Sequence, residues 1–424
     1  MAEVKAFRAL RFTPKAGDIG ALVCPPYDII SEEERLAYLA GNPCNIIRLE
    51  LPRTGADPYA EAGAQYRAWL REGILAPDKA PGLYIYEEEF TAGGVRRRVK
   101  GIQCRVRLEE FSKGVVLPHE ETLSKAKADR FDLMKACGCN FSSIYSLYFD
   151  PQNAVRSIAD SLSAGAPDQQ FSGADGIVHR LWCVYDPAVI ARVEALFADK
   201  KLYIADGHHR YETALNYRRW LAEQGVQAPG ADYVLMTLVN MEHEGLVVFP
   251  THRIVRGLQG YDPAALLEAC GRFFDSAPLP GGPAAAQAAL DRGYAAGQTV
   301  FVLYDGAGCH SLTLRDHGAM QEFGAGHSEP WRKLDVSVLH SLVLERCLGI
   351  DKENMANQKN LTYTRDAAQA LAAVDSGSAN CAFLLNPTRV EQIAAVAAAG
   401  DKMPQKSTYF YPKLITGAVM NQLL

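Results

Sequence analysis

Short apolar runs separated by polar turns recur along the chain and predict strands that alternate with helices. The middle third shows the pattern best: residues 180–185 and 201–205 are apolar and of strand length, and residues 187–198 between them predict a helix. Asp186 and Pro187 are a helix start signal, because aspartate caps free backbone N–H groups and proline suits the first helical position. This region therefore predicts a strand–helix–strand unit.

A second helix is predicted directly after the strand over 201–205. It begins at Asp206 and Gly207 and extends to about Gln224, because apolar or aromatic residues recur there at helical spacing. Near the N-terminus, Ser31 and Glu34 have the spacing of a capping box and predict the start of another helix.

Two β-hairpins are predicted from apolar runs separated by turn residues. One joins residues 83–90 to 96–108 around a glycine pair, and the other joins 233–240 to 246–250.

A shift in composition marks the expected boundary between two parts of the chain. Residues 257–297 are rich in Ala, Gly and Pro, and we place a domain boundary near residue 255. The segment beyond it mixes predicted strands and helices, which suits an α/β layer. Its elements are strands over 299–304 and 381–385 and helices over 336–347, 365–374 and 389–398.

Composition narrows the classes of protein that the chain can belong to. Its 424 residues suit two or three domains. With 44 Lys and Arg against 49 Asp and Glu, the net charge is −5, which argues against a nucleic-acid partner because phosphate backbones attract basic proteins. No apolar run approaches the roughly 20 residues of a membrane helix, so no membrane partner is expected. The N-terminus lacks a secretion signal, and we expect a cytoplasmic protein whose ten cysteines are reduced.

The strongest candidate for chemistry is the sequence Asp206-Gly207-His208-His209-Arg210, at the junction of the predicted strand and helix. The first turn of a helix has free N–H groups and the positive end of the helix dipole. With a guanidinium and two imidazoles beside them, these groups suit a phosphate. Asp206 could in addition hold Mg²⁺ or orient a hydroxyl group.

A plain helix cap is the main alternative interpretation of the same residues. Asp206 could be an N-cap beside two solvated histidines. This alternative explains Asp206 but not the cations that follow, since positive charge at a helix N-terminus opposes the dipole. A metal site made by His208 and His209 is disfavoured because adjacent helical residues diverge. We therefore favour an anion site.

Three further groups could contribute. In the first, Glu120 lies beside His119 and could act as a general base, with Thr122 and Arg130 near a substrate. A solvated charged helix explains the same residues equally well. The spacing is not HExxH, so it does not predict a zinc protease.

The other two groups lie in the second half of the chain. His252 and Arg253 follow a predicted strand, and Lys406 and Ser407 lie among aromatic residues. Both groups could bind a phosphoryl group, and Lys406 and Ser407 could instead form part of an interface. The sequence has no P-loop, Rossmann or nucleophile-elbow signature, so any nucleotide chemistry would need another scaffold.

Five ordered segments resemble the prokaryotic family called domain of unknown function 1015. The resemblance spans nearly the whole chain, although the label of that family supplies little function. The segments are CPPYD (24–28), HEET (119–122), DGHHR (206–210), LDVSVLH (334–340) and MPQKST (403–408).

The strand–DGHHR–helix segment is also similar to the phosphate-binding motif of the ParB/sulfiredoxin-like superfamily. The resemblance implies an α/β fold in two parts: a mixed-sheet, ParB/sulfiredoxin-like phosphate-binding domain over 1–255, and an α/β domain over 256–424 that closes the site. Proteins with a DGHxR-type motif include kinases of free L-serine, nucleotide switches bound to DNA, and reductases that phosphorylate a sulfinic acid.

The function implied by this resemblance is a serine kinase-like phosphotransferase of serine metabolism. It would act on the hydroxyl of a small amino acid, above all free L-serine or O-phospho-L-serine, with ATP, ADP or pyrophosphate as phosphate partner and Mg²⁺ as cofactor. The direction of transfer stays open, as does a homodimer. Two alternatives also stay open: a nucleotide-binding ParB-like regulatory module without turnover, and a phosphatase of a small phosphorylated metabolite.

The roles of the residues follow partly from the motif and partly from chemistry. By the motif, Asp206, His208, His209 and Arg210 would contact the phosphates and the metal, with Asp206 as metal ligand. By chemistry, Asp206, His209 and Glu120 are the catalytic candidates, and either carboxylate could be the base. The complete set for phosphate binding is Gly207, His208, His209, Arg210, His252, Arg253, Lys406 and Ser407, and the set for substrate binding is His119, Thr122 and Arg130.

Overall fold

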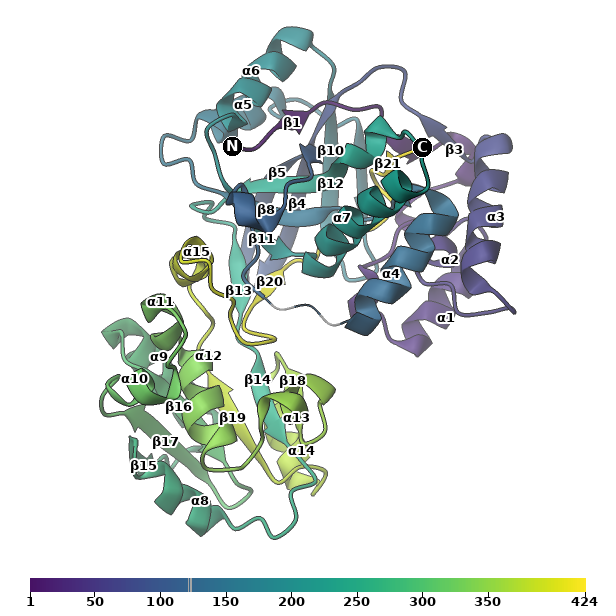
Figure 1. Cartoon of the computed structure of the whole chain (residues 1–424). Coiled ribbons are helices and arrows are strands. Elements are labelled where there is room, and N and C mark those ends of the chain that lie inside the picture. The colour runs from purple at the N-terminus through teal and green to yellow at the C-terminus, as the bar shows by residue number, and fades with distance from the viewer. Residues whose placement is uncertain (121, 123) are drawn as a thin grey trace. The chain divides into compact units, whose positions relative to one another are not determined.

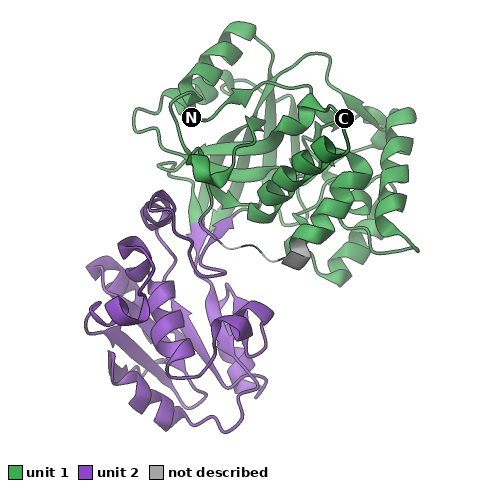
Figure 2. Ribbon diagram, viewed as in Figure 1, with its two compact units in different colours: residues 1–118, 122–247, 412–424 green, residues 119–121, 248–411 purple. Residues whose placement is uncertain are grey.

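The computed structural model describes residues 1–120, 122 and 124–424, without the side chains of 124–126, and the chain forms two compact units (Figure 2). Unit 1 comprises residues 1–118, 122–247 and 412–424, and unit 2 comprises residues 119–121 and 248–411. We had expected a boundary near 255 and a second part that extends to 424. The last residues belong to unit 1 because Asn421 and Gln422 pair with Asn140 and Cys139.

Unit 1 is built on a mixed sheet that has nine strands among the described residues, in the order β6-β11-β8-β12-β5-β4-β10-β9, with β1 also paired to β5. The β6–β11 and β8–β12 pairs are parallel. The strands are β1 (Val4–Lys5), β4 (Leu83–Ala92), β5 (Val95–Arg107), β6 (Val116–Leu117), β8 (Ile144–Tyr148), β9 (Gln169–Ser172), β10 (Val178–Val184), β11 (Leu202–Asp206) and β12 (Tyr233–Asn240).

Helices cover one face of this sheet, as Figure 1 shows. Apolar side chains of β4, β5, β8, β11 and β12 pack there against α5, α6 and α7, which forms the main core cluster of the unit. Helix α4 lies along both α7 and α3. The helices of unit 1 are α1 (Glu32–Gly41), α2 (Ile47–Glu50), α3 (Pro58–Arg71), α4 (Ser124–Cys137), α5 (Ala154–Leu162), α6 (Pro187–Phe197) and α7 (His208–Glu223). Two small antiparallel pairs complete it: β2 (Leu10–Phe12) with β3 (Leu75–Pro77), and β7 (Cys139–Asn140) with β21 (Asn421–Gln422).

Several local predictions are confirmed. Asp186 caps α6 through the N–H of Ala188, and Ser31 and Glu34 form the capping box at the start of α1. The hairpin of β4 and β5 is also present, with Ile85 opposite Ile102.

The second predicted hairpin is wrong. Strand β12 pairs with β5 and β8, so both of its edges are occupied. The strand that follows, β13 (Val247–Phe249), pairs instead with β20 (Tyr409–Tyr411). Hydrophobic alternation predicted that strand but could not predict its partner, because pairing depends on which edges the fold leaves free.

Unit 2 contains an antiparallel sheet in the order β15-β17-β16-β19-β14-β18. Its strands are β14 (His252–Val255), β15 (Phe274–Pro278), β16 (Val300–Tyr304), β17 (Cys309–Leu314), β18 (Leu361–Thr364) and β19 (Cys381–Leu385). Its helices are α8 (Pro263–Cys270), α9 (Gly282–Ala296), α10 (Ala319–Phe323), α11 (Glu329–Arg332), α12 (Asp335–Val338), α13 (Lys352–Asn357), α14 (Ala367–Asp375) and α15 (Val390–Ala398).

One predicted helix of unit 2 has an unusual second half. The sequence predicts a single α-helix over 336–347, but α12 ends at Val338 and continues as a π-helical segment, η6 (Leu339–Glu345). The wider π turn is rare and is often found at functional sites. Hydrophobic periodicity over so few residues does not distinguish the two geometries.

Candidate functional site

The candidate site of unit 1 begins where β11 ends and α7 starts. The predicted strand–turn–helix is present: β11 ends at Asp206, Gly207 has a φ of 101°, and α7 begins at His208. The ladder between β11 and β8 is irregular between Ile204 and Asp206, as at a β-bulge. Gly207 is the N-cap, and no side-chain hydrogen bond caps the helix. Asp206 is therefore not the helix cap, and the backbone N–H groups of the first turn receive no bond from a capping side chain.

Asp206 instead holds two cations. Its Oδ2 accepts a hydrogen bond from Arg210 at 2.7 Å, and its Oδ1 accepts one from Nζ of Lys413 at 2.5 Å. The three side chains are between 9% and 18% exposed. Burial alone would raise the pKa of the Asp206 carboxyl, but Lys413 and Arg210 hold it well below its usual range. Asp206 is therefore ionised across the physiological range.

Gly207 lets Arg210 lie close to the turn. A Cβ on residue 207 would come within 2.9 Å of Nε of Arg210, closer than real Cβ contacts allow. The other end of the guanidinium donates from NH1 to the carbonyl of Ser143 at 2.5 Å. Two protein acceptors and a missing side chain thus fix the orientation of Arg210 over the start of α7.

A buried carboxylate lies behind Arg210. Glu50 and Arg130 line, together with Arg210, a cavity of about 40 Å³, which is room for one or two water molecules. Arg130 donates to the carbonyl of Glu50 at 2.8 Å and stacks over the ring of Tyr27 at 4.0 Å. Burial raises the pKa of Glu50, although Arg130 and Arg210 oppose the rise. Arg130 and Arg210 of the Asp206 cluster thus line the same small cavity.

The remaining predicted residues of unit 1 lie along the first two turns of α7. His208 is buried and His209 is half-buried. The hydroxyl of Thr122 donates to Glu212 at 2.8 Å, and Lys127 pairs with the same carboxylate at 2.8 Å.

Four other predicted residues meet in unit 2. The carbonyl of His119 accepts from the N–H of Met403 at 2.7 Å, and its Nε2 lies 3.0 Å from the hydroxyl of Thr408. Glu120 accepts from the N–H of Lys406 at 2.8 Å. Ser407 donates to the carbonyl of Pro404. His119 and Glu120, almost 300 residues away in sequence, are therefore neighbours of residues 403–408.

Arg253 contacts residues 403–408 as well. Its side chain is 1% exposed, and it donates to the carbonyls of Thr251 and Lys406 and to Nε2 of His340. Burial lowers the pKa of Arg253 to about 10, so it stays charged. Burial, followed by the charge of Arg253, lowers the pKa of His252 to about 4 and keeps it neutral. The donors of Arg253 are thus engaged by protein acceptors.

The comparisons with known proteins place the chain in a family. The family model described as Protein of unknown function (DUF1015) matches residues 4–337. The chain belongs to this family. No curated protein matches it.

Several solved structures are similar to this DUF1015 member at low identity. A mutant of a free serine kinase in complex with AMP is 11% identical, with 77% of this chain and 92% of that chain covered and a TM-score of 0.40. A mutant of a free serine kinase in complex with ADP is 10% identical, with 76% and 91% covered and a TM-score of 0.39. A conserved hypothetical protein from Pyrococcus furiosus is 13% identical, with 74% and 92% covered and a TM-score of 0.36.

A magnesium ion was expected at Asp206 of this DUF1015 chain. Both carboxylate oxygens of Asp206 face protein cations, and the described residues contain no group of three or more His, Cys, Asp or Glu that could hold a metal ion. These residues do not fit a resident metal. None of the helices within the described ranges is long and apolar enough to cross a membrane.

Sequence reasoning missed Glu50 and the pairing of Lys413 with Asp206. Lys413 lies 207 residues from Asp206, and no local pattern links them. Glu50 lies in α2 within an apolar stretch, where an isolated acidic residue is itself a signal because charged residues are seldom fully buried without a partner.

Proposed function

We propose that the chain is a phosphotransferase that moves a phosphoryl group to or from the hydroxyl of a small amino acid, above all free L-serine. The observation that carries the proposal is the start of α7, where Arg210 and Lys413 are gathered on Asp206 beside a helix start without a side-chain cap. The resemblance of the DGHHR segment to the motif of free serine kinases supports the choice of substrate.

In this proposal, the backbone N–H groups of the first turn and Arg210 neutralise the phosphoryl group. Phosphoryl transfer depends mainly on positioning and on neutralising charge. A guanidinium can bind phosphate oxygens with two parallel hydrogen bonds, and Arg210 is already oriented by Asp206 and Ser143. Little reorganisation is then needed when the substrate binds.

We propose that Asp206 positions the two cations and does not accept the serine proton. A carboxylate whose pKa is held far below neutrality is a weak base, because base strength falls with pKa. Glu120, in unit 2, stays our other candidate for the base, on its chemistry alone. We expect Glu120→Gln to lower the transfer rate and to leave binding of the phosphate partner unchanged.

The test is an assay of the full chain with serine, Mg²⁺ and ATP, ADP or pyrophosphate in turn, with phosphoserine measured by ³¹P NMR. The reverse reaction starts from phosphoserine and each acceptor. We expect transfer with at least one phosphate partner. Arg210→Gln should reduce transfer. Its matched control is Arg219→Gln, which removes an exposed guanidinium from the same helix, α7.

Folded protein that transfers no phosphate in any combination would refute the proposal. Release of inorganic phosphate without an acceptor would indicate the phosphatase alternative. Nucleotide binding without turnover, together with nucleotide-dependent DNA binding in a gel-shift assay at physiological salt, would indicate the regulatory alternative.

A further inference from the structure

Unit 2 contains a cavity of about 190 Å³ that the proposed function does not use. Residues of α10, α11, η6 and α13 line it, together with residues 402–405. All of these elements belong to unit 2, so the cavity is complete within one compact unit. Most ligand pockets are concave, with aromatic walls and a few polar groups. This cavity has both kinds of residue.

One wall of the cavity is a fixed pair of flat rings. His327 stacks on Trp331 with their ring centroids 3.8 Å apart and an angle of 9° between the ring planes. Asp401 holds the imidazole, since its Oδ1 lies 3.1 Å from Nδ1 of His327. The same carboxylate accepts from the N–H groups of Ser328 at 2.6 Å and Lys402 at 2.8 Å. The wall is thus rigid before a ligand arrives, which lowers the entropic cost of binding.

The charged residues of the cavity favour an anion. Lys352 and Lys402 line it together with Glu345, so the formal charge of these three side chains is 2 − 1 = +1. Burial raises the pKa of the Glu345 carboxyl, although Lys352 opposes the rise.

The π-helical segment η6 supplies the polar part of the wall. His340 and Ser341 line the cavity from η6 and are 5% and 6% exposed. Nε2 of His340 lies 3.3 Å from Nε and 3.2 Å from NH2 of Arg253. Because arginine can only donate, Nε2 is the acceptor and Nδ1 bears the proton. Burial, together with Arg253, lowers the pKa of His340 well below its usual value, so the imidazole is a neutral donor.

We propose that this cavity binds a small planar ring that carries a carboxylate or phosphate group, with the ring against the His327–Trp331 wall and the anionic group at Lys352 and Lys402. Stacking on an aromatic wall selects flat ligands. The two lysines select negative charge, and the volume suits a single ring system. The residues that line it belong to unit 2, whereas the Asp206 cluster belongs to unit 1, and the proposal does not depend on phosphotransfer.

Calorimetric titration of the full chain with indole-3-acetate, benzoate and AMP tests the proposal. The first two probes carry a carboxylate and AMP carries a phosphate, so the series separates the two kinds of anion. Indole-3-acetamide is the matched neutral probe. We expect saturable binding of at least one ring-bearing anion, and binding at least about tenfold weaker for the amide because the lysines lose their partner.

Variants then locate the site. The double variant Lys352→Gln/Lys402→Gln should weaken the anionic probes about tenfold and leave the amide unchanged. His327→Ala should weaken charged and neutral rings alike, because the stacking wall is lost. The control Lys333→Gln removes an exposed lysine that pairs with Glu329 outside the cavity, and it should have no effect.

Two results would overturn the proposal. The first is the absence of saturable binding of all probes at millimolar concentration to folded protein. The second is binding that is equal in the wild type and in the double lysine variant. AMP binding that is lost in Arg210→Gln but kept in the double lysine variant would belong to the Asp206 cluster, and it would also count against this site.

Discussion

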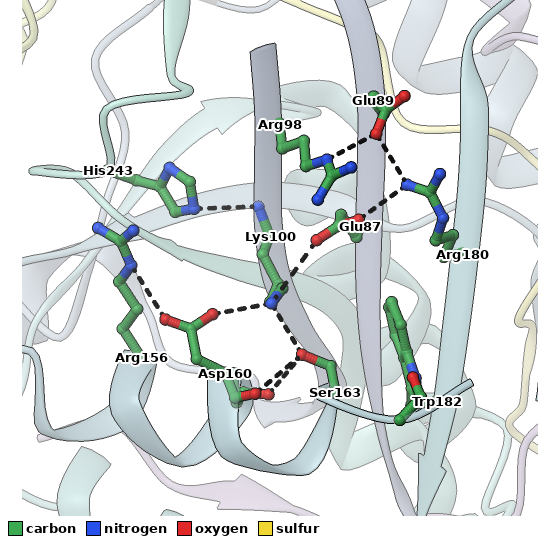
Figure 3. Close-up of polar contacts among 12 residues, drawn as sticks. Glu87, Glu89, Arg98, Lys100, Arg156, Asp160, Ser163, Arg180, Trp182 and His243 are labelled. Carbon is green, nitrogen blue, oxygen red and sulfur yellow. Dashed lines mark hydrogen bonds and ion pairs between the residues drawn. The ribbon is translucent and has the colours of Figure 1, made fainter. Parts of the chain in front are cut away.

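Unit 1 contains two dense groups of charged residues that differ in kind. One is the Asp206 cluster, and the other, which we call the outer network, lies on β4, β5, β10 and α5 (Figure 3). In the outer network, Lys100 contacts Asp160 at 2.8 Å and Glu87 at 3.6 Å. Arg180 contacts Glu87 at 2.9 Å. These ion pairs join side chains to side chains. Asp160 and Arg98 at the edge of the network are 47% and 60% exposed, whereas Lys100 and Arg180 are 14% and 17% exposed.

The Asp206 cluster has fewer charges but a different setting. One carboxylate pairs with two cations, Arg210 from the same turn and Lys413 from near the end of the sequence. Both cations lie at the start of a helix, where the dipole disfavours positive charge. In the outer network, the cations Lys100 and Arg180 lie on strands and pair with carboxylates. The comparison teaches that density of charge does not mark a site. We propose that cations held against an unfavourable field, beside backbone donors that no side chain caps, are the better indication of one.

The largest difference between the Asp206 cluster and the outer network is expected in the transfer rate of Arg210→Gln. The substitution should lower kcat/KM for phosphoserine formation by about 10²–10³, because one donor to the developing charge is lost. Arg180→Gln removes a guanidinium from the outer network and should leave the rate unchanged. Steady-state assays of both purified variants decide the comparison. Equal rates would mean that the Asp206 cluster has no catalytic role.

The next effect concerns stability. Lys413→Met leaves Asp206 with Arg210 as its remaining ion-pair partner, and unfolding in urea at neutral pH should show a loss of about 3 kcal/mol. Because the pKa of Asp206 is lowered in the fold, its ionic contribution is present above the unfolded value of 3.8 and is lost as pH falls through the lower folded pKa. The difference between wild type and variant should therefore shrink in acid. A constant difference over all pH values would contradict this account.

Gly207→Ala tests the close approach of Arg210 to the turn. The positive φ of 101° and the contact of 2.9 Å with Nε of Arg210 both oppose a Cβ. Thermal unfolding should show a loss of about 2 kcal/mol. Gly225→Ala is the matched control, since Gly225 also has a positive φ but its Cβ would meet open space. A fall in transfer rate should appear for Gly207→Ala alone.

A smaller effect is expected from Glu88, a buried carboxyl on β4. Burial raises its pKa from 4.5 to about 8, so its folded form holds a proton that the unfolded chain has lost. Stability should therefore fall as pH rises from 4.5 to 8. His179 beside it has a pKa lowered to about 4 and acts in the opposite direction below 6.5. Between pH 6.5 and 8, the free energy of unfolding of the wild type should fall by about 1 kcal/mol, and Glu88→Gln should remove this fall. Urea unfolding at each pH measures both.

The smallest effect is expected in the outer network. Arg98→Gln removes an exposed partner of Glu89 and should cost less than about 1 kcal/mol, with the cost reduced further at high salt. A larger loss that is independent of salt would show that the outer network stabilises the fold as strongly as the Asp206 cluster, and the comparison would fail.

The sequence predicts the elements that depend on local signals. The junction of β11 and α7 is confirmed because an apolar run, a glycine and helical spacing are all local signals. The predicted partner of β13 is wrong, and the π-helical geometry of η6 was not predicted, because free strand edges and side-chain packing decide them.

The candidate site was predicted only in its local part. The DGHHR segment identifies Asp206 and Arg210, but the contact of Asp206 with Lys413 arises only when the last residues return to unit 1. Arg253 looked like a phosphate ligand because it is a cation beside a histidine. In the structure Arg253 is buried in β14 and donates to the carbonyls of Thr251 and Lys406, contacts that no sequence pattern indicates.

The most direct test of the central claim is calorimetric titration of pyrophosphate into the wild type, Arg210→Gln and Arg219→Gln. The account predicts saturable binding to the wild type and to Arg219→Gln, with binding lost in Arg210→Gln. Equal affinity in all three proteins, or no binding to a folded wild type, would contradict the claim that the start of α7 is an anion site.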